Sequence, residues 1–197
     1  MHRVFVSYHH RNDQKEKEEF VQWAKDNEVF IDWSVDTGEI DDTLPDEEIR
    51  EIIRDEYLQD CRVTIVLVGT ETKNRKHVDW EIYSSMYDGK INKRSGIIVI
   101  LLPSASSFSY HVAYPNEKPV IYPKQTEWVT IDSKAEYERR YPYVPERIID
   151  NLVAGANISI INWRDITPDG LRLMIENAYN NADNINYVFP PRRKRNS

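Results

Sequence analysis

The chain has 197 residues, of which 26 are basic and 33 acidic, so its net charge is −7. This length allows one domain with a substantial core, and the negative charge argues against a general nucleic-acid binder, because phosphate binding needs basic surface. The single cysteine, Cys61, excludes an intrachain disulfide and fits a reducing compartment. Residues 1–20 lack a signal-peptide hydrophobic region, and no apolar run approaches the roughly 18 residues of a membrane span. We therefore expect a cytoplasmic protein without a membrane segment.

Strands and helices alternate along the first half of the chain. We expect strands at 3–7, 29–33, 63–68 and 96–102, and helices over 16–26, from Pro45 onward and around 78–86. The apolar run 63–68 is short, β-branched and bounded by Gly69, which is typical of a strand buried on both faces. This alternation predicts parallel strands joined by right-handed crossovers, with helices on both faces of the sheet.

Residues 103–156 interrupt the alternation. They contain six prolines and many tyrosines, and this aromatic content argues against a disordered linker. We predict an ordered, irregular insertion with short helices near 134–140 and 145–152.

The chain then returns to the earlier pattern, with a fifth strand at 158–163 and a last helix that begins after Thr167. The predicted fold is α/β: a flavodoxin-like, open, parallel five-stranded sheet in a single domain over 1–185. The basic segment 186–197 is predicted to be a disordered tail.

Polar and aromatic side chains gather where the predicted strands end, which is where open α/β sheets bind ligands. The candidate site residues are Ser7, Tyr8, His9 and His10 after the first strand, Trp33 and Asp36 after the second, and His77 and Glu81 on the helix after the third. Glu81 precedes the core residue Ile82, so its carboxylate is expected on a flank of that helix.

The order RVFVSYHHRND, VFIDWSVDTGEIDD and CRVTIVLVGTETKNRKHVDWEI resembles the three sequence boxes of TIR domains. More narrowly, it resembles the TIR-like group typified by the nucleotide-signalling component of bacterial Thoeris antiphage defence. The resemblance covers about residues 1–102 well and 157–180 only as a general pattern. TIR motifs usually carry tryptophan four residues before the key glutamate, whereas this chain has His77 there.

The resemblance implies a TIR-like fold and NAD chemistry. Enzymatic TIR domains cleave the nicotinamide–ribose bond with a glutamate on the helix after the third strand, a position that maps onto Glu81. The resemblance also implies that NAD is a substrate, that a cyclic or conjugated ADP-ribose product activates a separate effector protein, and that the domain self-associates. The chain has neither a GxGxxG nor a GxxxxGK motif, so a resident dinucleotide cofactor is not expected, and no His or Cys pair has zinc spacing.

Glycosidic cleavage passes through an oxocarbenium-like state, which a single carboxylate such as Glu81 can stabilise because nicotinamide leaves as a neutral base. Tyr8 or Trp33 can stack on a ring, and Ser7 can bind ribose or phosphate. Either histidine of the first loop can move a proton, although ordinary packing or solvation explains each of these residues equally well. Two other functions stay open. A non-catalytic TIR-like interaction module would be favoured by a Glu81 buried in a salt bridge or by the lack of a pocket beside it, and a nucleoside deoxyribosyltransferase-like enzyme by turnover of nucleosides.

Overall fold

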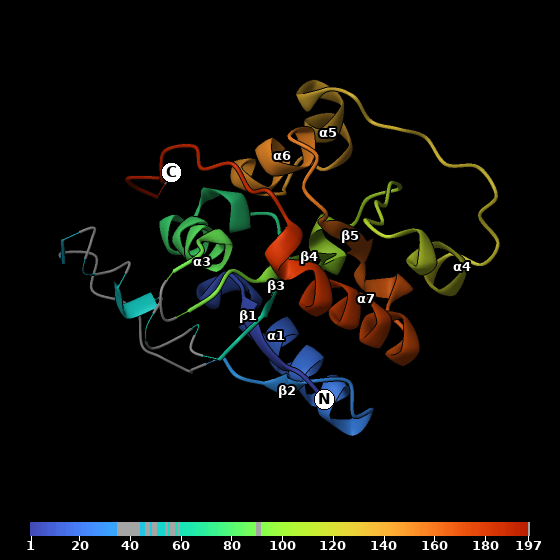
Figure 1. Cartoon of the computed structure of the whole chain (residues 1–197), viewed down its shortest axis with the longest axis horizontal. Coiled ribbons are helices and arrows are strands. Elements are labelled where there is room, and N and C mark those ends of the chain that lie inside the picture. Colours follow the sequence, from blue (N-terminus) through green and yellow to red (C-terminus); the bar gives the residue numbers. More distant parts are fainter. Residues whose placement is uncertain are drawn as a thin grey trace.

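A parallel five-stranded sheet in the order β2-β1-β3-β4-β5 forms the centre of the computed structural model (Figure 1). The structure describes residues 1–34, 44–45, 48, 51–53, 55, 58, 60–89 and 92–196. The strands are β1 (Arg3–Ser7), β2 (Ile31–Asp32), β3 (Val63–Val68), β4 (Gly96–Leu101) and β5 (Ser159–Asn162). This is the predicted flavodoxin-like order. The chain moves outward from β1 to β2 and then crosses back to β3, so the strand order reverses between β1 and β3.

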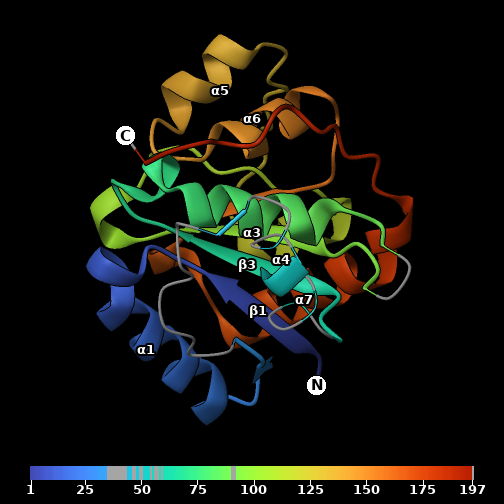
Figure 2. The same ribbon diagram turned by 90° about the vertical axis from the view of Figure 1, so that its left-hand side faces the viewer.

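Helices cover both faces of the sheet, as predicted. The α-helices are α1 (His10–Asp26), α3 (Lys76–Met86), α4 (Lys118–Ile121), α5 (Lys134–Arg140), α6 (Glu146–Val153) and α7 (Pro168–Asn181). Short 3-10 helices are η2 (Thr72–Asn74), η3 (Pro103–Ala105), η4 (Pro115–Glu117), η5 (Trp163–Asp165) and η6 (Ala182–Asn184). Figure 2 shows α1 and α7 below the sheet, α3 directly above it, and α5 and α6 higher on the same side as α3.

Alternating side chains of the central strands divide the core into two layers. Ile98 and Ile100 of β4 pack with α1 and α7, whereas Ile97 and Val99 pack with α3 and α6. Every residue of β3 and β4 is buried, as expected for strands with helices on both faces.

Two predicted boundaries were wrong. The first helix begins at His10, six residues before the predicted start, because the carbonyl of His9 accepts from the amides of Asn12 and Asp13 and so forms a first turn. The second strand contains only Ile31 and Asp32, since Val29 and its neighbour pack into the core without pairing to β1.

The two helices predicted inside the insertion are confirmed as α5 and α6, whereas the short α4 was not predicted. The helix expected from Pro45 onward lies mostly outside the described residues.

The prediction of a disordered basic tail was wrong for residues 186–196. This segment runs between α3 and α6 (Figure 2) and hydrogen-bonds to both helices. The indole of Trp80 donates to the carbonyl of Arg193 over 2.7 Å, and the amide of Val188 donates to Asn151 over 2.8 Å. Composition alone missed this packing, because these bonds use the backbone of the segment and the guanidinium of Arg192 lies over the ring of Trp80, 4.6 Å from its centre.

Candidate active site

Glu81 lies beside the carboxyl end of β1. Side chains alternate along this strand, so Val6 packs towards α1 while Phe5 packs towards α3. Ser7 also faces α3, and its hydroxyl donates to Oε2 of Glu81 over 2.5 Å. The two residues are 1% and 6% exposed. The bond therefore joins the end of β1 to the helix that follows β3, across the point where the strand order reverses.

Burial controls the charge of Glu81. It raises the pKa of this carboxyl from 4.5 to about 7, and the hydrogen bond from Ser7 opposes the rise. No charged neighbour in the described part of the chain contributes to the shift. Glu81 is thus a buried carboxyl that changes charge near neutral pH, which is the behaviour of many catalytic carboxyls.

The residues that follow β1 point in different directions. Tyr8 is buried on the α1 side, where its hydroxyl donates to Gln14 over 2.6 Å and its ring stacks on that of His10 at 4.2 Å. His9 is 6% exposed, and its Nδ1 has no hydrogen-bond partner among the described residues. Burial, and then the charge of Arg75, lower the pKa of His9, so its imidazole is neutral at pH 7.

A second buried carboxylate, Asp13, lies at the same edge of the sheet. The hydroxyl of Thr72 donates to Asp13 over 3.3 Å and accepts from the amide of Gly69 over 2.8 Å. A Cβ atom on Gly69 would lie 2.5 Å from Oδ1 of Asp13, so a larger residue after β3 would displace the Asp13 carboxyl. Burial raises the pKa of Asp13. The Ser7–Glu81 pair joins β1 to α3, and the Asp13–Thr72 pair joins α1 to η2, so both buried carboxyls lie near the carboxyl ends of β1 and β3, where the strand order reverses and open α/β sheets bind ligands.

Residues 5–107 match the family described as Thoeris protein ThsB, TIR-like domain. The matched segment runs from β1 to beyond η3 and contains Ser7, Asp13 and Glu81. The chain belongs to this ThsB TIR-like family. It is accordingly a TIR-like protein of Thoeris defence. No curated protein matches the chain.

The other predicted site residues of this TIR-like domain are not brought together. Trp33 is 38% exposed, and the guanidinium of Arg3 lies 4.0 Å from the centre of its ring. The register of β1 and β2 places the backbone of Trp33 beside Val4 and Phe5, before the Ser7 end of β1, and its ring contacts the residue that begins the strand. His77 is half-buried one turn before Glu81 on α3, and Asp36 lies outside the described residues.

Asp13 precedes residue 16, where the first helix was predicted to begin, yet the sequence contains a signal for its burial. The inward stripe of α1 contains Asp13, Lys17, Phe20 and Ala24, which follow one another at intervals of four, three and four residues. Extending this stripe backward from Phe20 would have placed an acid on the buried face of the TIR-like domain's first helix.

The described residues contain neither a metal-binding cluster nor a membrane-spanning helix. Within them, no three or more His, Cys, Asp or Glu side chains are grouped to hold a metal ion. None of the helices there has the length and apolar character needed to cross a bilayer.

Proposed function

We propose that this TIR-like protein consumes NAD. It cleaves the bond between nicotinamide and ribose with Glu81 and makes a cyclic or conjugated ADP-ribose signal. The signal then activates a separate effector protein of the defence system. The observation that carries the proposal is the buried Glu81 carboxyl, held by Ser7 at the edge of the sheet where the strand order reverses.

Cleavage of the nicotinamide–ribose bond requires little more from the protein than one correctly positioned carboxylate. When the bond between C1′ of ribose and N1 of nicotinamide breaks, its electron pair stays on nicotinamide, which leaves as a neutral molecule. Positive charge then develops on C1′ and the ring oxygen, and a carboxylate of Glu81 beside the ribose stabilises it. Water or another nucleophile, such as a hydroxyl or ring nitrogen, attacks C1′ and completes hydrolysis, cyclisation or conjugation.

The pKa of Glu81 suits this step. In the absence of substrate, burial keeps the carboxyl partly protonated near pH 7. The nicotinamide ring of NAD carries a positive charge, and a cation beside the carboxyl favours the ionised form. Substrate binding would thus generate the carboxylate in a site with little water, where its field on the developing cation is strong.

Ser7, His9 and Asp13 have supporting roles in this proposal. The hydroxyl of Ser7 orients the Glu81 carboxylate and leaves its other oxygen available to the ribose. Neutral His9 has a buried ring nitrogen that can accept a proton from an attacking hydroxyl. Asp13 carries a second carboxyl at the same edge of the sheet.

The low exposure of Glu81 also supports a second candidate. A carboxyl that is only 6% exposed needs a change in its surroundings before a ribose can reach it, whereas a non-catalytic interaction module needs no such access. Self-association, which we propose as part of the active state, would supply that change. No charged side chain among the described residues contributes to the pKa shift of Glu81, which weighs against a purely structural salt bridge.

The test is to incubate purified protein with NAD at high protein concentration and to identify products by mass spectrometry, beside a Glu81→Gln variant. We expect nicotinamide release and an ADP-ribose derivative from the wild type only. Equal release by both proteins would refute the role of Glu81. Turnover of nucleosides instead of NAD would identify a deoxyribosyltransferase-like enzyme, and inactivity even in lysate of phage-infected cells would favour the interaction module.

A further inference from the structure

Helix α3, which carries Glu81, is capped by a distant part of the chain. Within the described residues, its N-cap residue Arg75 contributes no capping side-chain bond. The cap comes from the C-terminal segment (residues 186–196), in which Oδ1 of Asn196 accepts from the amide of Lys76 over 2.8 Å. Asparagine is one of the best N-cap residues, because its side-chain oxygen accepts from an amide that has no partner inside the helix. The first turn of α3 is therefore completed by the far end of the chain.

The C-terminal segment binds the start of α3 at two further points. Oδ2 of Asp79 accepts from the amide of Arg193 over 2.8 Å, and the indole of Trp80 donates to the carbonyl of Arg193 over 2.7 Å. Lys76, Asp79 and Trp80 lie on one side of α3, because positions three and four apart share a face of a helix. The segment therefore holds the first turn of α3 and the residue directly before Glu81.

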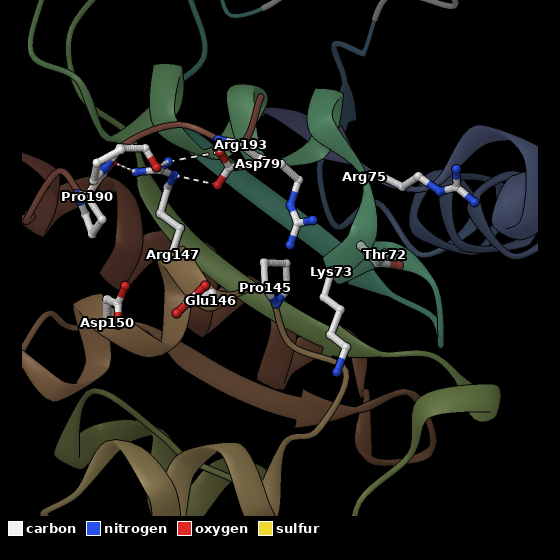
Figure 3. Close-up of a pocket in the computed structure, with 11 residues that line it drawn as sticks. Thr72, Lys73, Arg75, Asp79, Pro145, Glu146, Arg147, Asp150, Pro190 and Arg193 are labelled. Atoms are coloured by element: carbon white, nitrogen blue, oxygen red, sulfur yellow. Dashed lines mark hydrogen bonds and ion pairs between the residues drawn. The ribbon is translucent and has the colours of Figure 1, made fainter. Parts of the chain in front are cut away.

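One arginine joins this segment to both α3 and α6. Arg147 of α6 is only 3% exposed, and its guanidinium makes two hydrogen bonds to Asp79, of 2.8 and 2.9 Å. The same guanidinium donates to the carbonyls of Pro190 and Pro191 over 2.9 and 3.3 Å. Figure 3 shows Arg147 between Asp79 and Pro190, with dashed lines to both. Because a paired guanidinium and carboxylate fix each other's orientation, the position of the segment on α3 is well defined.

The Glu81 carboxyl lies on the side of α3 away from the C-terminal segment. Asp79 and Glu81 are two positions apart, which corresponds to about 200° around a helix. On the sheet side Ser7 donates to Glu81 over 2.5 Å, so α3 lies between this bond and the segment. In an α-helix each amide donates to the carbonyl four residues earlier, so the backbone of Glu81 is anchored on the first turn. Unwinding of that turn would therefore move the Glu81 carboxyl relative to Ser7.

We propose that Asn196 is a positioning residue for Glu81, and that the bonds of the C-terminal segment keep the first turn of α3 wound. This inference rests on the proposed function of Glu81. A wound first turn keeps the Glu81 carboxyl within reach of Ser7 and of a ribose at the edge of the sheet. Because a misplacement of about 1 Å can cost an enzyme about a hundredfold in rate, even a loosened turn slows the reaction.

The test compares Asn196→Ala with Asn196→Asp in the full chain. Aspartate keeps an oxygen that accepts from the amide of Lys76, whereas alanine has no acceptor. Asn184→Ala is the matched control, because Asn184 is an exposed asparagine of η6, outside the C-terminal segment. Three properties are measured: amide hydrogen exchange in α3 by mass spectrometry, stability to urea across pH, and kcat and KM for nicotinamide release.

For Asn196→Ala we expect amide exchange in the first turn of α3 to be about fivefold faster, and kcat to fall by about the same factor at unchanged KM. Water that enters beside the loosened turn should lower the pKa of Glu81, which burial raises to about 7 and which, among the described residues, only Ser7 opposes. The fall in stability between pH 4.5 and about 7 should therefore be smaller than in the wild type. Asn196→Asp and the control should behave as the wild type does.

Three results would overturn this positioning role. Faster exchange in Asn196→Ala with an unchanged pH dependence of stability would show a cap that is purely structural. Higher nicotinamide release by Asn196→Ala would show that the segment restrains the enzyme, and failure of Asn196→Asp to restore slow exchange would exclude the cap. Exchange and stability are measured without NAD, so they decide the positioning role even if no nicotinamide is released.

Discussion

Replacing Glu81 by Gln should stabilise the protein at neutral and alkaline pH while it removes activity. The substitution keeps the size of the side chain and its ability to accept from Ser7, but removes a group whose ionisation is opposed by burial. The pKa rise from 4.5 to about 7 corresponds to about 3 kcal/mol, as an upper bound, between the two protonation states.

The sign of the pH effect follows from the direction of this shift. Because the pKa of Glu81 is higher in the folded chain, the protonated form favours folding below pH 4.5, where both states hold the proton. As pH rises from 4.5 to about 7, the unfolded chain loses the proton first, and wild-type stability falls. The advantage of the Gln variant should thus grow across this window and level off above it.

The assay is urea unfolding of wild type and Glu81→Gln at a series of pH values from acid to mildly alkaline, followed by intrinsic fluorescence. Glu127→Gln is the control, since Glu127 is exposed and its carboxyl is solvated in both states. A stability difference for Glu81→Gln that does not change with pH, or that matches the control, would show that Glu81 is not held in a desolvated site.

Two other substitutions test the same helix. Ser7→Ala removes the hydrogen bond that lowers the pKa of Glu81, so the rise of NAD turnover with pH should move to higher pH by about one unit. The matched control is Ser84→Ala, which deletes a buried hydroxyl of α3 that has no described partner; an equal shift in both variants would contradict the prediction. Arg147→Met should lower the free energy of unfolding by about 3–5 kcal/mol, because it leaves the Asp79 carboxylate buried without its cation. Urea unfolding measures this loss, which should be partly recovered in the double variant with Asp79→Asn, and a loss under about 1 kcal/mol would exclude an important ion pair.

The parts of the fold that were predictable are those where one local pattern dominates. The run from Val63 to Val68 is apolar enough to allow only a strand buried on both faces, and the structure buries all of it. Glu81 was placed on the flank of α3 by its position next to Ile82, and the structure agrees. In both cases neighbours in sequence carry the information.

The remaining features depend on contacts between distant segments. The buried carboxyl of Asp13 lies against Gly69, 56 residues later, which has no side chain to displace it. The C-terminal segment looked disordered because its basic composition is visible in sequence, whereas the backbone bonds of Arg193 to Asp79 and Trp80 are not. The secondary-structure propensity of a segment does not depend on such contacts between distant residues, so only the three-dimensional structure shows them.

The bond between Trp80 and Arg193 also has a consequence for synthesis of the chain. The two residues are 113 positions apart in the chain. At a synthesis rate of about 5–20 residues per second, Arg193 is therefore added several seconds or more after Trp80. Asn196, which accepts from the first amide of α3, emerges still later. During that interval the indole N–H of Trp80 lacks its acceptor, although the ring can already pack against Phe5 and Leu58, which precede it in the chain. The contacts of α3 with the C-terminal segment can therefore form only when almost the whole chain has been synthesised.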